Sequence, residues 1–292
     1  MSFQFVDQIL TLEPNKRVVG IKHITAKDIY LVKKSLNEKP AILPGIVSEA
    51  VGQCFAWLVL SNNNFTYQPV GGVVEQIDFK NDAYLGDDII LEANIVSIEN
   101  EAITFNGIAR VADKEILSIT NSVAPLIPVC NLRDPQRAKN YFTKISSAKN
   151  LYQCEETIDK IDDKKFFDFK YDEILSCEQD DKIIAHKHIR ETEPFFEDHF
   201  SLRPVVPLTA LSQYNVSLAQ WYIDKFFPKK REQFAAKLMR NIKIYDFIDP
   251  GADIETIMKI SNDDESNYVF RFCSKVKGRR VFVAQLIFQR EM

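Results

Sequence analysis

The sequence has few cysteines, no excess of basic residues and no apolar run long enough to span a bilayer. Its five cysteines among 292 residues show no C-x-x-C spacing, which argues against a disulfide framework and against a thiolate zinc site. The net charge is −4 and the pI is about 5.7, so the strong positive surface that binds nucleic acid phosphates is missing. We therefore expect a protein of the reducing cytoplasm that binds neither nucleic acid nor a membrane.

Composition and length are those of an ordinary globular protein. Apolar residues make up 46% and charged residues 27% of the chain, and 292 residues are enough for two domains with cores of their own. Residues 1–7 contain neither the basic segment nor the apolar stretch of a signal peptide. We expect no targeting segment at this end.

The sequence contains two copies of one domain. Matching residues lie 165 or 164 positions apart: Asp7 and Asp172, His23 and His188, Phe105 and Phe270, Pro40 and Pro204, Trp57 and Trp221. A slip of one residue between the two offsets is what a single loop insertion produces. The period is too long for a solenoid repeat and has the size of a small domain. We predict a duplicated domain that folds as a pseudo-dimer within one chain. Assembly of such pseudo-dimers into a homo-oligomer is a further option that the sequence leaves open.

Each copy shows the same order of expected elements, namely a strand, a long helix and a meander of four strands. In copy one these are 18–24, the helix 46–60, and then 73–79, 89–98, 103–111 and 115–123; in copy two they are 183–189, the helix 208–227, and then 238–245, 253–261, 268–276 and 280–289. The first helix is apolar nearly all round, which is typical of a helix buried on most faces. An antiparallel meander can bury such a helix by wrapping around it, and two units can pair edge to edge.

We therefore expect the α+β class, with a first unit at 1–128, a connector at 129–165 and a second unit at 166–292. The connector has no counterpart elsewhere in the chain and carries mixed charges. It is far longer than the usual connection of about 4–6 residues, as expected for a segment that spans two domains. We expect it to be partly helical.

A motif in copy two resembles a known family. Glu193–Phe200 (EPFFEDHF) and Arg203–Pro207 (RPVVP) are similar to the pattern E-P-F-F-x-x-H-F-P-x-x-P-V-x-P-G of the 3-hydroxyacyl-(acyl-carrier-protein) dehydratases of the hot-dog fold. In copy one, Pro40–Gln53 resembles the segment of the same family that leads from the prolines into the central helix. Glu49 and Gln53 stand there at the family's spacing. The resemblance implies a double hot-dog, in which each half is an antiparallel sheet around a long helix.

In this family the active site takes its histidine from one unit and its carboxylate from the other. The resemblance therefore implies one composite site, with His199 as the base and Glu49 as the acid or the group that orients water. It also implies substrate-binding positions at Phe200, Pro207, Leu208 and Gln53. The implied reaction dehydrates a 3-hydroxyacyl thioester, carried on the phosphopantetheine of acyl carrier protein, to a trans-2-enoyl thioester. No metal and no cofactor of the protein's own are implied.

The residue types suit this chemistry. A neutral imidazole can take the proton from C2 of the substrate. A buried carboxyl group can keep a proton and give it to the hydroxyl that leaves C3. Backbone N–H groups at a helix N-terminus can polarise the thioester carbonyl.

The mirror site has lost both groups. At the offset of 164, Gln213 corresponds to Glu49, and Ser35 (or Lys34 in a looser register) corresponds to His199. Neither a glutamine nor a serine can act as acid or base near neutral pH. We expect one active and one inert site.

Two residues depart from the family pattern within the motif. Leu208 replaces the glycine that opens the helix, and Ser201 replaces a proline. Two other functions remain open. A hot-dog acyl thioesterase is one, because related hot-dog proteins are thioesterases in which a carboxylate activates water. A non-catalytic partner that binds acyl chains for a fatty acid or polyketide synthase is the other, because of Leu208 and of Gln213 at the mirror position.

Overall fold

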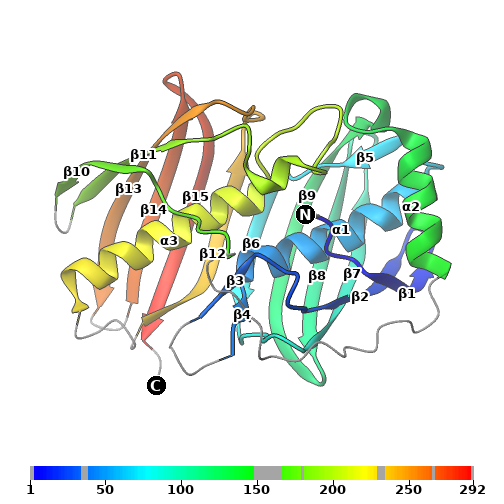
Figure 1. The fold of residues 1–292 in the computed structure, drawn as a ribbon, viewed down its shortest axis with the longest axis horizontal. Helices are drawn as coiled ribbons and strands as arrows, with labels where there is room; N and C mark the ends of the chain where they lie inside the picture. Colours follow the sequence, from blue (N-terminus) through cyan, green and yellow to red (C-terminus); the bar gives the residue numbers. More distant parts are fainter. Residues whose placement is uncertain are drawn as a thin grey trace.

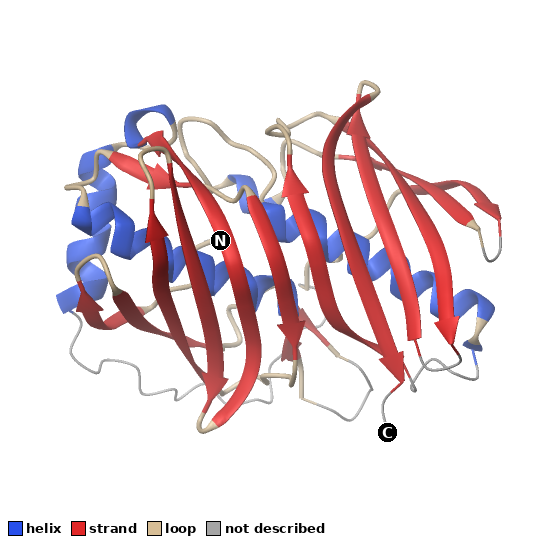
Figure 2. Ribbon diagram, turned by 180° about the vertical axis from the view of Figure 1, so that it is seen from behind, coloured by secondary structure: helices blue, strands red, loops and turns tan. Residues whose placement is uncertain are grey.

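The computed structural model describes residues 3–33, 39–147, 166–178, 181–228, 234–264 and 267–290. Two long helices, α1 (Pro44–Asn62) and α3 (Leu208–Phe226), lie end to end across one face of an antiparallel sheet (Figure 1). Seen from behind, the strands form a single continuous layer with both helices on its far side (Figure 2). This arrangement confirms the expected α+β class and the helix-wrapping sheet of each copy.

The strands follow the same order in the two copies. Copy one contains β1 (Gln8–Glu13), β2 (Arg17–His23), β5 (Tyr67–Pro69), β6 (Val73–Phe79), β7 (Asp88–Ile98), β8 (Ala102–Val111) and β9 (Lys114–Pro128), with a separate short pair, β3 (Leu31–Val32) and β4 (Ala41–Ile42). Copy two contains β10 (Glu173–Glu178), β11 (Lys182–His188), β12 (Phe234–Ile244), β13 (Asp253–Asp264), β14 (Asn267–Val276) and β15 (Arg279–Arg290). All ten expected strands are present with shifts at their ends. The strands β1 and β10 were missed, because neither alternates clearly between buried and exposed residues, and β3, β4 and β5 were missed because they are only two or three residues long.

The backbone itself repeats between the copies. The same kind of β-bulge interrupts the pairing of β1 with β2 and of β10 with β11. The Asp7 carboxylate accepts the backbone N–H of His23 at 2.7 Å, and Asp172 accepts that of His188 at 2.7 Å. The repeated Asp and His positions in the sequence therefore mark a shared structural contact at the start of each sheet.

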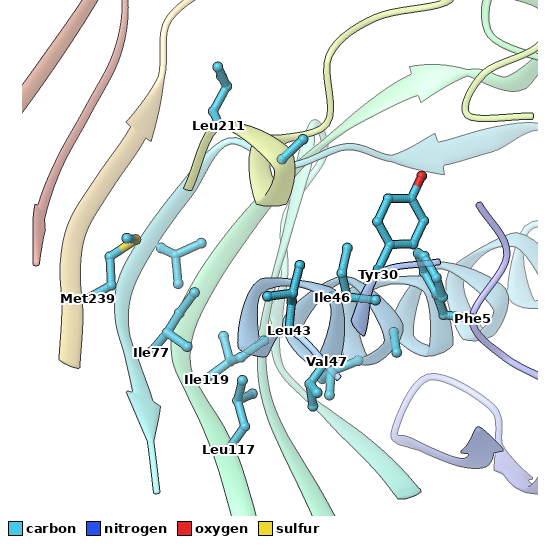
Figure 3. Close-up of a cluster of buried hydrophobic side chains, with 14 of the residues drawn as sticks. Phe5, Tyr30, Leu43, Ile46, Val47, Ile77, Leu117, Ile119, Leu211 and Met239 are labelled. Atoms are coloured by element: carbon cyan, nitrogen blue, oxygen red, sulfur yellow. The ribbon is translucent and has the colours of Figure 1, made fainter. Parts of the chain in front are cut away.

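The two copies join through β6 and β12, which pair antiparallel with Ile77 opposite Met239. Figure 3 shows the apolar cluster at this junction, which includes Leu43 just before α1, Leu211 of α3 and the strand residues Ile77 and Met239. The pairing covers one edge of each half-sheet. It confirms the expected edge-to-edge association within one chain.

Helix α1 is the core helix of copy one. Its mean hydropathy over 18 residues is 1.2, so by length and composition it is apolar enough to cross a membrane, but 67% of that window is buried inside the fold. A core helix wrapped by a sheet has this composition, and the helix is buried on most faces as its sequence predicts.

The connector expected at 129–165 begins with a 3-10 turn (Val129–Asn131) and continues into α2 (Pro135–Ser147). Tyr141 of α2 stacks on Trp57 of α1, with ring centroids 5.4 Å apart. This part of the connector is therefore packed against copy one. Residues 148–165 lie outside the described part of the chain.

Gly107 of β8 allows α1 to approach the sheet closely, because a methyl group at this position would lie 2.3 Å from Cγ1 of Val51. Gly107→Ala should therefore lower the free energy of unfolding by about 1–3 kcal/mol, the usual cost of overpacking, as measured by urea unfolding. Gly52→Ala is the matched control, since its methyl meets no atom within 4 Å and should raise stability by up to about 1 kcal/mol. Superimposable unfolding curves for Gly107→Ala and wild type would contradict this packing.

Candidate active site

A cavity of about 150 Å³ lies between α1 and the sheet of copy one, and residues of copy two also line it. Both His199 and Glu49 are among the lining residues. Much of the rest of the lining is apolar and includes Phe55, Trp57, Leu60, Val74, Phe105 and Ile119. From Glu49 to Leu60 the helix rises about 16 Å. The structure thus places the two predicted acid–base residues in the wall of one mainly apolar cavity.

His199 has a defined orientation and tautomer. Its Nδ1 lies 3.1 Å from the carbonyl oxygen of Val205, so Nδ1–H donates there and Nε2 keeps its lone pair. The ring stacks on Phe200 at 4.2 Å and meets the Phe3 ring edge-on at 5.5 Å. Burial lowers the pKa of His199 to about 3. The imidazole is therefore neutral near neutral pH and can accept a proton at Nε2.

Phe200 has an unusual backbone conformation for a large residue. Its φ is 58°, in the left-handed region, which costs about 1–2 kcal/mol for a residue with a Cβ. The side chain is buried in a small apolar cluster with Val70, Leu132 and Val205, and that packing holds the turn. As a result both the Phe200 ring and the His199 ring line the cavity.

Glu49 is held from both copies. Its Oε2 accepts the Thr209 hydroxyl at 2.7 Å, and its Oε1 accepts Nε2 of Gln53 at 2.9 Å. Burial raises the pKa of Glu49, and the two hydrogen bonds and the nearby Arg133 only partly oppose this shift. The carboxyl group can therefore keep a proton at a pH where an exposed glutamate is ionised.

Gln53, a predicted substrate-binding residue, uses its amide within the protein. Nε2 donates to the carbonyl oxygen of Phe3 at 2.9 Å as well as to Glu49, and Oε1 accepts the N–H of Phe5 at 2.9 Å. The N–H of Phe3 in turn donates to the Asp198 carboxylate at 2.6 Å. Gln53 therefore orients Glu49 and holds the N-terminal segment against α1. The Phe3–Asp198 hydrogen bond then joins that segment to the loop that carries His199.

Pro207 and Leu208 stand where α3 begins at the cavity. Pro207 is the N-cap residue and no side chain caps the helix, so the first-turn N–H groups keep their partial positive charge for a ligand. Leu208 replaces the glycine of the family pattern, and its side chain packs over Gly71, where a methyl group would lie 3.3 Å from Leu208 Cδ1. Gly71 thus provides the room that the larger residue needs.

The mirror position is filled by protein. Gln213 is 4% exposed, and its Oε1 has no hydrogen-bond partner in the described part of the chain. On the next residue, the ring of Tyr214 packs edge-on against Phe169, with centroids 5.1 Å apart. Ser35 and its alternative Lys34 lie outside the described residues.

Arg133 and Thr209 are residues of the cavity wall that were not predicted from the sequence. Thr209 donates its hydroxyl to Glu49, and Arg133 adds a positive charge. Its Cζ lies 5.4 Å from the centre of the Phe200 ring, and its Nε is buried without a hydrogen-bond partner among the described residues. The segment before it is tied to the loop after His199, because Leu202 N–H donates to the carbonyl oxygen of Leu132 at 2.9 Å. In the sequence, Arg133 is one of several charged residues in the connector, and nothing marked it out.

Sequence comparisons relate copy two to dehydratases. A family model described as ApeI-like, ApeI dehydratase, matches residues 175–284. The chain is 31% identical over 114 residues to the 3-hydroxyacyl-(acyl-carrier-protein) dehydratase FabZ of Caldanaerobacter subterraneus subsp. tengcongensis, covering 38% of this chain and 79% of that protein. It is 29% identical over 115 residues to FabZ of Clostridium kluyveri, covering 39% of this chain and 78% of the relative.

Structural comparisons cover nearly the whole chain. The tesB protein of Mycobacterium avium subs paratuberculosis superposes with a TM-score of 0.57 and 10% identity, covering 98% of this chain and 97% of that one. The 12:0-ACP thioesterase of Umbellularia californica superposes with a TM-score of 0.53 and 9% identity, covering 94% of both chains. At this identity the likeness concerns the fold alone, and it confirms the double hot-dog.

The hydrogen bond from Thr209 favours the ionised form of Glu49. Thr209→Val removes the hydroxyl at nearly constant volume, so it should raise the pKa of Glu49, whereas Thr209→Ser should leave it close to that of wild type. The measurement is an infrared titration of the carboxyl band, with Glu49→Gln to identify the band. Identical titrations for wild type and Thr209→Val would mean that the hydroxyl does not bear on Glu49.

Proposed function

The chain belongs to the family of 3-hydroxyacyl-(acyl-carrier-protein) dehydratases of the hot-dog fold, and on this basis we propose that it dehydrates 3-hydroxyacyl thioesters to trans-2-enoyl thioesters. The observation that supports the proposal is that His199 from copy two and Glu49 from copy one line the same cavity. That is the arrangement which the family's composite site requires.

The two groups have complementary protonation states. Nε2 of the neutral His199 takes the proton from C2, and the electron pair of that C–H bond moves towards the thioester carbonyl. Glu49 gives its proton to the C3 oxygen, which leaves as water while the C2–C3 double bond forms. Burial lowers the pKa of His199 and raises that of Glu49, so the neutral base and the protonated acid are favoured together. Proton transfer from the imidazolium back to the carboxylate restores the site.

The surroundings support both the charge and the chain of such a substrate. The uncapped N-terminus of α3 lies at the cavity beside Leu208, where its N–H groups suit a thioester oxygen that gains negative charge. The mainly apolar lining of the cavity suits an acyl chain and excludes water from it. We propose that acyl carrier protein delivers the substrate on its phosphopantetheine, and that the reaction takes place in the cytoplasm.

His199→Ala and Glu49→Gln should each lower kcat for dehydration by about 10²–10⁴, the usual worth of a positioned acid or base. The double variant should fall little further, because the two residues act in one step. Gln213→Ala, at the mirror position, is the control and should retain turnover. The readout is the formation of enoyl thioester from a 3-hydroxyacyl thioester on acyl carrier protein. Full activity in either single active-site variant would refute the proposed pair.

The same assay separates the proposed reaction from its rivals. Interconversion of 3-hydroxyacyl and enoyl thioesters, with the thioester bond intact, supports a dehydratase. Release of free thiol that depends on Glu49 would instead identify a thioesterase. Binding of the acyl carrier without turnover would identify a non-catalytic partner.

The pH profile of kcat/KM should follow from the two pKa shifts. Activity requires protonated Glu49, so it should fall as the pH rises through the raised pKa of this group. Activity also requires neutral His199, so the acid limb should lie near pH 3 instead of near 6.5. Residual activity of Glu49→Gln should lack the basic limb. A rate that climbs steadily across the pH range in which Glu49 ionises would contradict the assigned roles.

A further inference from the structure

Arg133 places a positive charge in the wall of the cavity that contains His199 and Glu49. Burying a charged group is costly unless it is paired or used. Burial lowers the pKa of Arg133, while the carboxylates of Asp198 and Glu49 oppose that shift. An arginine keeps its charge near neutral pH even so.

The protein leaves part of the guanidinium without a partner. Its Nε is buried and has no acceptor in the described part of the chain. The Phe200 ring, with its centre 5.4 Å from Cζ, supports the guanidinium but is not a hydrogen-bond acceptor for Nε–H. The Nε–H group is thus enclosed by protein, and what Arg133 offers to a ligand in the cavity is the positive charge of its guanidinium.

The charge also acts on the reacting groups. Its field lowers the pKa of His199 and, against the effect of burial, that of Glu49. Burial raises the pKa of Tyr30, and the carboxylates of Asp198, Glu193, Glu49 and Glu197 raise it further. Arg133 is therefore the cation in electrostatic contact with both members of the proposed acid–base pair.

We propose that Arg133 is a third catalytic side chain, whose positive charge in the cavity wall stabilises the negative charge that forms on the thioester oxygen of the substrate. This inference rests on the proposed function. When Nε2 of His199 takes the C2 proton, the electron pair moves to the thioester oxygen. It returns to form the C2–C3 double bond as the C3 oxygen leaves with the proton of Glu49. Arg133 keeps its own protons throughout and contributes only its charge.

The local structure is suited to hold such a group in place. Leu132 is fully buried, and its carbonyl oxygen accepts the N–H of Leu202 at 2.9 Å in the loop that follows His199. The N–H of Arg133 itself donates to the carbonyl oxygen of Val129 at 2.8 Å. The start of the connector is thereby fixed to the loop that carries the base, and preorganised charge is more effective than mobile charge. The connector would thus supply a third element of the active site.

The first test uses turnover. Arg133→Met keeps most of the side-chain volume and removes the charge, so kcat should fall by about 10²–10³ while KM changes little. Arg133→Lys keeps the charge without the planar fork and should recover part of the loss. Arg203→Met is the matched control, because Arg203 is an exposed arginine on the same loop as His199, over Phe247 at 4.8 Å, and should stay near wild type. A change in KM alone, or a kcat equal to that of wild type, would overturn the inference.

The second test needs no substrate, so it separates this inference from the proposed function. In the infrared titration of Glu49, Arg133→Met should raise the pKa of the carboxyl group, because a nearby positive charge is lost, and Arg133→Lys should not. A role in packing alone would lower the melting temperature and leave this titration unchanged. An unchanged titration would therefore overturn the inference even if the wild type proved to catalyse another reaction. A wild type without dehydratase activity would refute the proposed function, and the role of Arg133 in dehydration with it.

Discussion

Backbone hydrogen bonds between β6 and β12 turn two half-sheets into one layer. Because each half-sheet carries its helix on the same face, this pairing also brings the N-terminal ends of α1 and α3 together at the centre of the molecule (Figure 1). The hydrogen bond from Thr209 of α3 to Glu49 of α1 exists only through that meeting. The base, the acid and the helix N-terminus come from segments of both copies, which the ladder aligns together with contacts such as Phe3–Asp198 and Leu202–Leu132.

The junction is symmetric in backbone and asymmetric in side chains. On one side Thr209 supplies a hydroxyl to the Glu49 carboxylate. At the equivalent place on the other side, a methyl group added to Gly45 would lie 3.1 Å from Oε1 of Gln213. Aromatic rings such as those of Phe169 and Tyr214 then occupy the interior of copy two. Because both copies belong to one chain, their sequences can differ. A complete site on one side therefore does not require a second complete site at the mirror position.

Burial and the charge of Arg133 both act on the candidate site. Burial moves the pKa values of His199 and Glu49 in opposite directions, which favours the neutral form of both groups. The strained turn at Phe200 and the amide of Gln53 hold the two side chains in place. The positive φ of Phe200 costs conformational free energy, and in return the loop holds the His199 side chain in an orientation that an unconstrained loop would not keep.

Much of the fold could be predicted from the sequence, because the internal repeat and the period of apolar residues are local signals. They were sufficient for the helices α1 and α3 and for the strands of both meanders. The pairing of His199 with Glu49 was implied by the family resemblance, and both residues line one cavity. The strands β1 and β10 escaped prediction, since their mixed burial leaves no clear alternation.

Only the tertiary structure decided how the remaining parts meet. Gly71 makes room for Leu208, and Gln53 joins Glu49 to the N-terminal segment. Arg133 reaches the cavity from a connector that has no counterpart in the repeat. These contacts join residues that are far apart in the sequence. Only the folding of the backbone brings such residues close enough to touch, so the local sequence does not reveal them.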